Sequence, residues 1–102
     1  MATRLDLHYA LQNVTGLENL YFQPPEGMKL KYPCVVYELA KKDVLRADDK
    51  VYQIHNPYTV TLIDLDAESD IPNKMLKSFQ YCSFERRFIA SHMYHDVFTI
   101  YY

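Results

Sequence analysis

The spacing of apolar residues at the start of the chain predicts a helix over Thr3–Val14. Leu5 and Leu11 recur at helical intervals with either His8 or Tyr9 between them, so these side chains can share one face. A face of this kind is what a surface helix buries against its domain. We therefore expect an amphipathic helix that packs through Leu5 and Leu11.

Six later segments have the composition or the alternation of β-strands. Tyr58–Leu65 is the clearest, because successive apolar and Thr residues fall on two distinct faces. Pro33–Leu39 is apolar on both faces, which is typical of a central strand that is buried on both sides. The remaining strands are predicted at Leu20–Gln23, Lys50–Ile54, Tyr81–Ala90 and Val97–Tyr102.

A second, short helix is predicted over Asn73–Phe79. Asp70 is a suitable N-cap for it, and Pro72 is tolerated in a first helical turn. The polar residues Ser91–Asp96 are expected to connect the last two strands. The long polar segment Ala40–Asp49 is expected to be either an extended hairpin or a mobile loop.

The order of these elements predicts the fold class. Helices do not alternate regularly with strands, so we expect an α+β fold. Its mostly antiparallel sheet should be flanked by the N-terminal helix and the second short helix. The chain has 102 residues, which predicts one domain over residues 1–102.

Composition points to a surface for protein contacts. The chain has ten Tyr and five Phe but no Trp, and a small core cannot bury fifteen aromatic rings. Formal net charge is -2, which argues against a dedicated nucleic-acid binder. No apolar segment is long enough for a signal peptide or a membrane span, so no membrane contact is expected.

Candidate metal ligands and nucleophiles are few. Cys34 and Cys82 lack a second ligand at zinc spacing and are expected to be buried free thiols. His92, His95 and Asp96 could bind a metal on a helix, but a turn is the favoured interpretation. No metal site is therefore predicted from these residues.

An acidic run follows the clearest strand, with carboxylates at every second position from 64 to 70. These oxygens could hold calcium, but the run lacks the glycine and the terminal Glu of a standard calcium loop. A solvated turn that leads into a helix is the favoured interpretation. No nucleophile elbow, phosphate loop or dinucleotide fingerprint is present, so we expect neither an enzyme nor a cofactor.

Four segments together resemble small proteins from the structural modules of bacteriophages and prophages. The chain is similar to the family of tail-terminator or tail-completion proteins, some of which are called minor capsid proteins. The segments are NLYFQPPEGMKLKYPCVVYE, ADDKVYQIHNPYTVTLIDLD, IPNKML and HDVFTIYY, beginning at Asn19, Ala47, Ile71 and His95. Together they extend over most of the chain.

The resemblance implies an α+β subunit that forms a ring, expected to be a hexamer, on the last ring of the tail tube. It implies contacts with the tail tube protein and with the connector or neck proteins of the head. Genomic DNA would only pass through the lumen. The implied location is the virion, after assembly in the host cytoplasm, and the resemblance implies no catalytic residue.

Candidate contact residues lie in two places. A ring uses heterologous contacts between different patches, for which polar, exposed segments are suitable. The predicted contact residues are Arg46, Asp48, Asp49, Lys50 and Tyr52 in the long excursion, with Arg86 and Arg87 in the first C-terminal strand. Arg86 and Arg87 should point to opposite faces of that strand, and ordinary surface charge is the alternative interpretation for both.

Two other functions stay open at this point. A head-side neck or adaptor protein would have the same composition but would bind the connector. A small monomeric binding module would have neither ring contacts nor an affinity for tail tubes.

Overall fold

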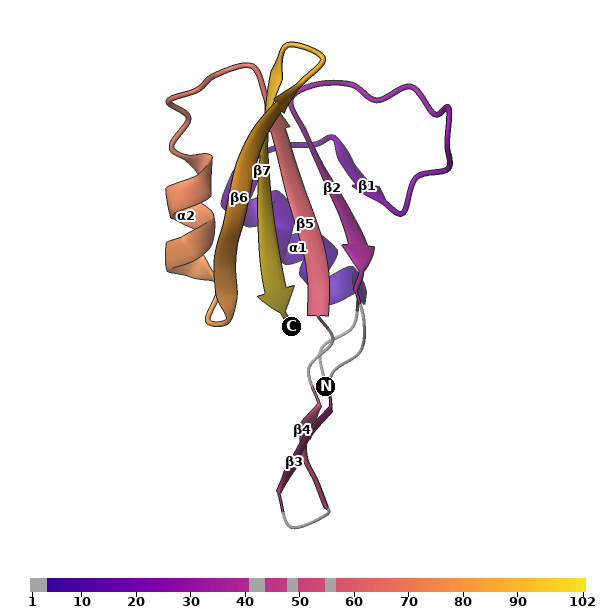
Figure 1. Ribbon diagram of the computed structural model, residues 1–102, viewed down its shortest axis with the longest axis vertical. Helices are drawn as coiled ribbons and strands as arrows, with labels where there is room; N and C mark the ends of the chain where they lie inside the picture. Colours follow the sequence, from indigo (N-terminus) through magenta and orange to yellow (C-terminus); the bar gives the residue numbers. More distant parts are fainter. Residues whose placement is uncertain (1–3, 41–43, 48–49, 55–56) are drawn as a thin grey trace.

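The computed structural model describes residues 4–40, 44–47, 50–54 and 57–102, with side chains described outside 41–56. Seven strands and two helices lie in these ranges (Figure 1). They are α1 (Arg4–Thr15), β1 (Leu20–Phe22), β2 (Cys34–Leu39), β3 (Val44–Ala47), β4 (Lys50–Ile54), β5 (Pro57–Asp64), α2 (Ile71–Ser78), β6 (Cys82–Ala90) and β7 (Met93–Tyr101). The predicted α+β class is confirmed.

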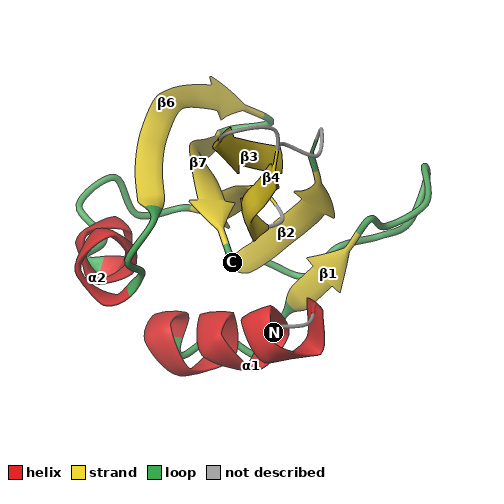
Figure 2. Cartoon of the chain, turned by 90° about the horizontal axis from the view of Figure 1, so that it is seen from below, coloured by secondary structure: helices red, strands yellow, loops and turns green. Residues whose placement is uncertain are grey.

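Five strands form one sheet in the order β1-β2-β5-β7-β6. β1 and β2 are parallel, and the other neighbours are antiparallel. Both helices lie on the same side of this sheet (Figure 2). The opposite side, here called the open face, is covered by neither helix.

A second sheet contains only β3 and β4, which lie beyond one end of the main sheet (Figure 1). The long excursion after β2 therefore contains a hairpin, one of its two predicted forms. Because Ala40 N donates to Pro57 O over 2.9 Å, the hairpin leaves and rejoins the main sheet at adjacent points.

The core lies between the sheet and the helices. Strand alternation places side chains of β2, β5 and β7 on the side that bears the helices, where they meet α1 and α2. The residues that form this cluster are Leu7, Leu11, Val35, Tyr37, Tyr58, Val60, Leu62, Met75, Phe79, Phe98 and Ile100. Val60 and Phe98 are opposite one another in the ladder, as are Val35 and Leu62, so the core follows directly from the register.

The predicted face of the first helix is wrong by part of a turn. Leu7 and Leu11 are fully buried, whereas Leu5 is half exposed and Tyr9 is more than half exposed. Leu7, Leu11 and Thr15 follow one i, i+4 stripe along the helix, whereas Leu5 and Leu11 are six residues apart and do not share such a stripe. Thr15 is the last residue of that stripe, and its hydroxyl donates to Leu11 O over 2.7 Å.

Asp70 occupies the N-cap position of the second helix, as predicted, but does not cap the helix through its side chain. Asp70 has helical backbone angles, and its side chain makes no capping hydrogen bond. The hydroxyl of Ser69 accepts a hydrogen bond from Ile71 N at 3.3 Å. Asp70 instead lies 3.5 Å from Lys74 Nζ, one helical turn away.

The connection between the last two strands is shorter than predicted. β7 begins at Met93, so only Ser91 and His92 form the turn. Both residues have positive φ, 52° and 62°, which is the backbone of a type I′ hairpin turn. His95 and Asp96 therefore belong to a strand and point to opposite faces.

Candidate assembly surface

Strand β6 forms an exposed edge of the main sheet. β7 lies on one side of it, and no other described strand pairs with the opposite side. Phe84, Phe88 and Ile89 are 46%, 39% and 66% exposed, so this edge presents apolar side chains to solvent. Edges of this kind are templates for pairing with another chain unless they are protected.

The edge at the other end of the sheet differs from β6. β1 has three residues and is followed within three positions by Pro24 and Pro25, which have no N–H to donate. β6 has nine residues and contains no proline. The two edges therefore differ strongly in their capacity to pair with another strand.

A bulge divides β6 into two halves. Phe84 is opposite Phe98 and Arg86 is opposite Val97, so Glu85 is the extra residue. A bulge bends its strand, and β6 arches toward the open face (Figure 2). The Phe84 ring contacts the Phe98 ring edge-on at 5.4 Å, which places Phe84 on the side that bears the helices.

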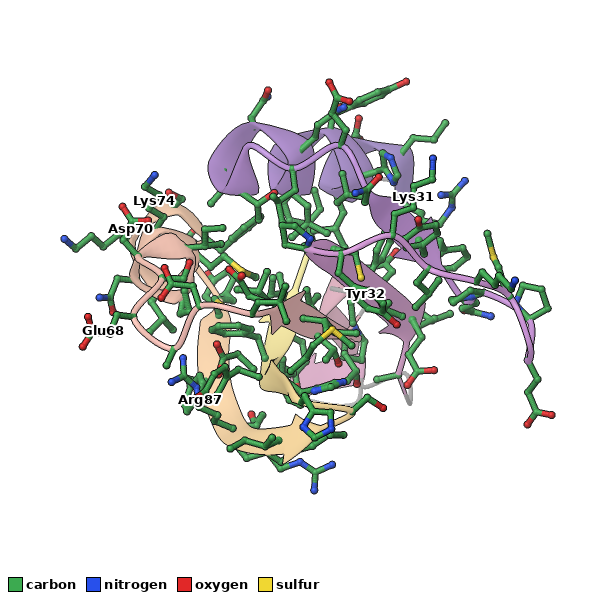
Figure 3. The ribbon with its side chains drawn as sticks, turned by 90° about the horizontal axis from the view of Figure 1, so that it is seen from above. Lys31, Tyr32, Glu68, Asp70, Lys74 and Arg87 are labelled. Atoms are coloured by element: carbon green, nitrogen blue, oxygen red, sulfur yellow. The ribbon has the colours of Figure 1, made fainter. Side chains whose placement is uncertain are left out.

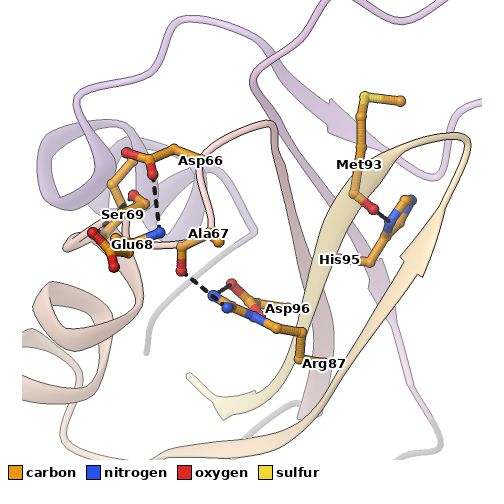
Figure 4. A network of polar contacts seen from close by, with 9 residues as sticks. Asp66, Ala67, Glu68, Ser69, Arg87, Met93, His95 and Asp96 are labelled. Carbon is orange, nitrogen blue, oxygen red and sulfur yellow. Dashed lines mark hydrogen bonds and ion pairs between the residues drawn. The ribbon is translucent and has the colours of Figure 1, made fainter.

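Arg87 is held inside the subunit by a buried carboxylate. Asp96 is 2% exposed and accepts two hydrogen bonds from Arg87, from Nε at 2.6 Å and from Nη2 at 3.0 Å. Nη1 of Arg87 also donates to Ala67 O at 3.0 Å (Figure 4). The hydrogen bonds to Asp96 raise the pKa of Arg87 above its ordinary value.

This pair joins three parts of the chain. It connects β6 to β7 and to the loop that leads into α2, and Arg87 extends toward that loop (Figure 3). A bidentate guanidinium–carboxylate pair fixes geometry as well as charge. Arg87 was predicted as a subunit contact, and the structure gives its guanidinium partners within the subunit.

Arg86 lies on the open face, as its position next to Arg87 predicts. Its guanidinium is 5.3 Å from the centre of the Phe88 ring. Phe88 in turn stacks on His95 at 4.7 Å, with the rings 17° apart. Arg86, Phe88 and His95 thus form a cationic and aromatic strip across β6 and β7.

The candidate metal ligands do not converge. His95 Nδ1 lies 3.1 Å from Met93 O, and Asp96 faces away from it toward Arg87. Within the described residues, no three His, Cys, Asp or Glu side chains form a group that could hold a metal ion. The structure therefore does not bring His92, His95 and Asp96 together as ligands.

The acidic run is organised by its own backbone. Asp64 Oδ1 accepts from Asp66 N at 3.1 Å, and Asp66 Oδ1 accepts from Glu68 N at 2.9 Å (Figure 4 shows the second bond). These are successive Asx turns, in which a carboxylate stabilises the backbone two residues on. The run forms the loop before α2, as the favoured interpretation predicts.

Both thiols are free, as predicted. Cys34 is fully buried in β2, and Cys82 is partly buried at the start of β6. Burial raises the pKa of each thiol to about 11, so both are protonated at neutral pH.

The candidate residues of the excursion can be placed only in part. Arg46 lies in β3, and Lys50 and Tyr52 lie in β4, but their side chains are outside the described part of the structure. Asp48 and Asp49 lie outside the described residues. Of the predicted contact residues, Arg46, Lys50 and Tyr52 therefore lie in the β3–β4 hairpin, and Arg86 and Arg87 lie in β6.

Sequence reasoning missed the apolar part of this surface. Phe84, Phe88 and Ile89 look like ordinary strand residues, and only the strand order makes β6 an edge. Asp96 was considered as a metal ligand and not as the partner of Arg87. Opposite charges nine residues apart around a turn were the available signal, but the position of the turn had to be known first.

No family model, curated protein or solved structure matches the chain. Within the described residues, no helix is both long and apolar enough to cross a membrane.

Proposed function

We propose that this protein is a structural subunit that ends the tail tube of a long-tailed bacteriophage as a ring and joins the tail to the head. The proposal rests on the resemblance of the four segments, and on a hairpin suited to contact a neighbouring subunit. It assigns the protein no catalytic reaction. Its partners are further copies of the chain, expected as a hexamer, the tail tube protein and the connector or neck proteins.

The observation that carries the proposal is the β3–β4 hairpin. The two strands make a sheet of their own that lies beyond the end of the main sheet (Figure 1). An isolated two-stranded hairpin is marginally stable in water, so burial against another molecule would stabilise it. A protruding hairpin that contacts a different patch on the next copy is the heterologous contact that a ring requires.

The charge of the chain is compatible with a DNA passage. Each subunit has a net charge of -2, so a ring would not present a dominant positive field to the phosphates. DNA is therefore proposed to pass through the lumen without specific binding.

The test is to measure binding to isolated tail tubes and to the head connector. Light scattering should give a ring mass, or electron microscopy should show rings at tube ends. A protein that ignores tubes but binds the connector would support the neck adaptor. A protein that binds neither would overturn both phage functions and leave the small binding module.

The hairpin can be removed without stretching the sheet. Because Leu39 pairs with Tyr58 and Ala40 N donates to Pro57 O, a two-residue Asn-Gly turn can replace residues 41–56. The shortened chain should keep the circular dichroism of the sheet and lose tube capping. The matched control replaces Ser91-His92 with Asn-Gly, which alters a different hairpin and should leave capping intact.

A further inference from the structure

We propose that β6 is a self-pairing edge, which joins β6 of a second copy antiparallel across a two-fold axis and extends the sheet through both subunits. The inference does not rest on the proposed function. It concerns the free protein, because a closed ring needs heterologous contacts and this contact is isologous. Three features of β6 carry it: its outward backbone groups, its bulge and its charges.

The outward backbone groups follow from the ladder with β7. Ala90 and Met93 close the type I′ turn, so Ala90, Phe88 and Arg86 point their backbone groups toward β7. Ile89 and Arg87 lie between them and therefore point theirs outward. This half of the edge thus offers the N–H and C=O groups of two residues.

The other half of β6 is in the opposite phase. Tyr81 O accepts from Tyr101 N at 2.9 Å, so Tyr81 and Ser83 point toward β7. Cys82 and Phe84 then point their backbone groups outward. The extra residue of the bulge, Glu85, causes this change of phase.

The bulge sets the centre of an antiparallel pairing between two copies of β6. The outward residues Phe84 and Arg87 are equally far from the midpoint between Glu85 and Arg86, and so are Cys82 and Ile89. An antiparallel copy centred there pairs Phe84 with Arg87 of the second copy, and Cys82 with Ile89. The side chains of all four residues lie on the side that bears the helices, because these residues alternate with Ser83, Arg86 and Phe88. In the paired copies, the helices of both subunits therefore lie on the same side of the extended sheet.

The charges at the centre of this pairing are complementary. Glu85 of each copy faces Arg86 of the other copy, so the symmetry makes the opposite-charge pair twice. Opposite charges across a ladder stabilise it, and like charges destabilise it. The exposed Phe84, Phe88 and Ile89 gain cover in the same contact. A register shifted by one residue would separate Glu85 from Arg86, and it would also place side chains of opposite sheet faces next to each other.

The first experiment measures the dimer and its charge dependence by sedimentation equilibrium from about 1 μM to about 1 mM. Arg86→Glu places two carboxylates opposite each other twice, so its dimer should be at least about tenfold weaker. The double variant Glu85→Arg/Arg86→Glu exchanges the charges and restores complementarity, so it should regain most of that loss. The matched control Lys29→Glu reverses an exposed charge outside β6 and should leave the dimer unchanged.

The second experiment locates the contact by hydrogen exchange. The outward amides of Phe84, Arg87 and Ile89 should become protected as protein concentration rises, and Ile89→Pro should abolish the dimer without removing a bond to β7. A wild-type protein that is monomeric up to about 1 mM would overturn the inference. So would an oligomer whose outward β6 amides exchange freely, or a dimer that Arg86→Glu leaves unchanged. If the protein failed to cap tail tubes, the results expected here for the dimer and for amide protection would not change.

Discussion

Removing Arg87 should destabilise the fold more than removing its partner Asp96. The Asp96 side chain is 3% exposed and the Arg87 side chain is 36% exposed, so the carboxylate is shielded from water while the guanidinium is partly solvated. In Arg87→Ala the buried carboxylate loses two charged hydrogen bonds. In Asp96→Ala the guanidinium can turn into solvent.

The magnitudes follow from that asymmetry. Loss of one partner of a buried ion pair costs about 3–5 kcal/mol, and the partial exposure of Arg87 lowers the value here to about 2–3 kcal/mol. Asp96→Ala should cost about 1–2 kcal/mol, from the lost bonds and a small cavity. For a domain of this size, the Arg87→Ala loss corresponds to a fall in Tm of roughly 10–15 °C.

The assay is urea and thermal unfolding followed by circular dichroism at a few μM protein, with coincident probes to establish two-state behaviour. Arg86→Ala is the matched control, because it removes the neighbouring arginine and only its contact with the Phe88 ring, and it should cost less than about 1 kcal/mol. The double variant Arg87→Ala/Asp96→Ala should be more stable than Arg87→Ala alone. Additive losses in the double variant, or an Asp96→Ala variant less stable than Arg87→Ala, would refute the reasoning.

Four further predictions concern the core, one turn and one thiol. Leu11→Ala should cost about 2–5 kcal/mol in chemical denaturation and Leu5→Ala less than about 0.5 kcal/mol, because only Leu11 is buried; equal costs would contradict the α1 packing. Tyr37→Phe should cost about 1 kcal/mol in the same assay, because its hydroxyl lies 2.7 Å from His8 Nδ1; no change would mean that this bond contributes nothing. Gly16→Ala should lower the free energy of unfolding by about 1 kcal/mol, measured from the shift in Tm, because Gly16 has φ +71°. The cost should come from backbone strain alone, since a Cβ at this position meets nothing within 4 Å. Burial raises the pKa of Cys34 from 9.0 to about 11, so the folded state holds this proton more tightly than the unfolded state. The free energy of unfolding should therefore be unchanged below about pH 9 and fall by about 2–3 kcal/mol toward pH 11, and Cys34→Val should make that decline shallower.

The sequence predicts the elements of this fold better than their contacts. Strand Pro57–Asp64 and its buried face follow from alternation, because one face of the sheet is covered by helices and register then fixes every side chain. The face of α1 is harder to predict, since Leu5 and Leu7 are equally apolar and only the sheet decides which is buried. The turn before β7 is harder still, because Ser91 and His92 adopt positive φ without the glycine or asparagine that usually indicates such a turn.

The candidate surface depends on facts that no local pattern contains. Adjacent arginines in a strand must face opposite ways, so the separation of Arg86 from Arg87 is predictable. Which of them reaches a buried carboxylate depends on the register between β6 and β7, and a bulge at Glu85 shifts that register by one residue. The same bulge reverses the phase of the outward backbone groups and places Glu85 and Arg86 at the centre of a symmetric edge. Because the turn at Ser91 and His92 sets the register of the half of β6 that contains Arg87, deleting Glu85 should leave the Arg87–Asp96 pair intact and weaken only the proposed dimer, in which Arg86 would then lie opposite Arg86 of the second copy. The charge exchange at Glu85 and Arg86 should leave both the ion pair and the dimer intact.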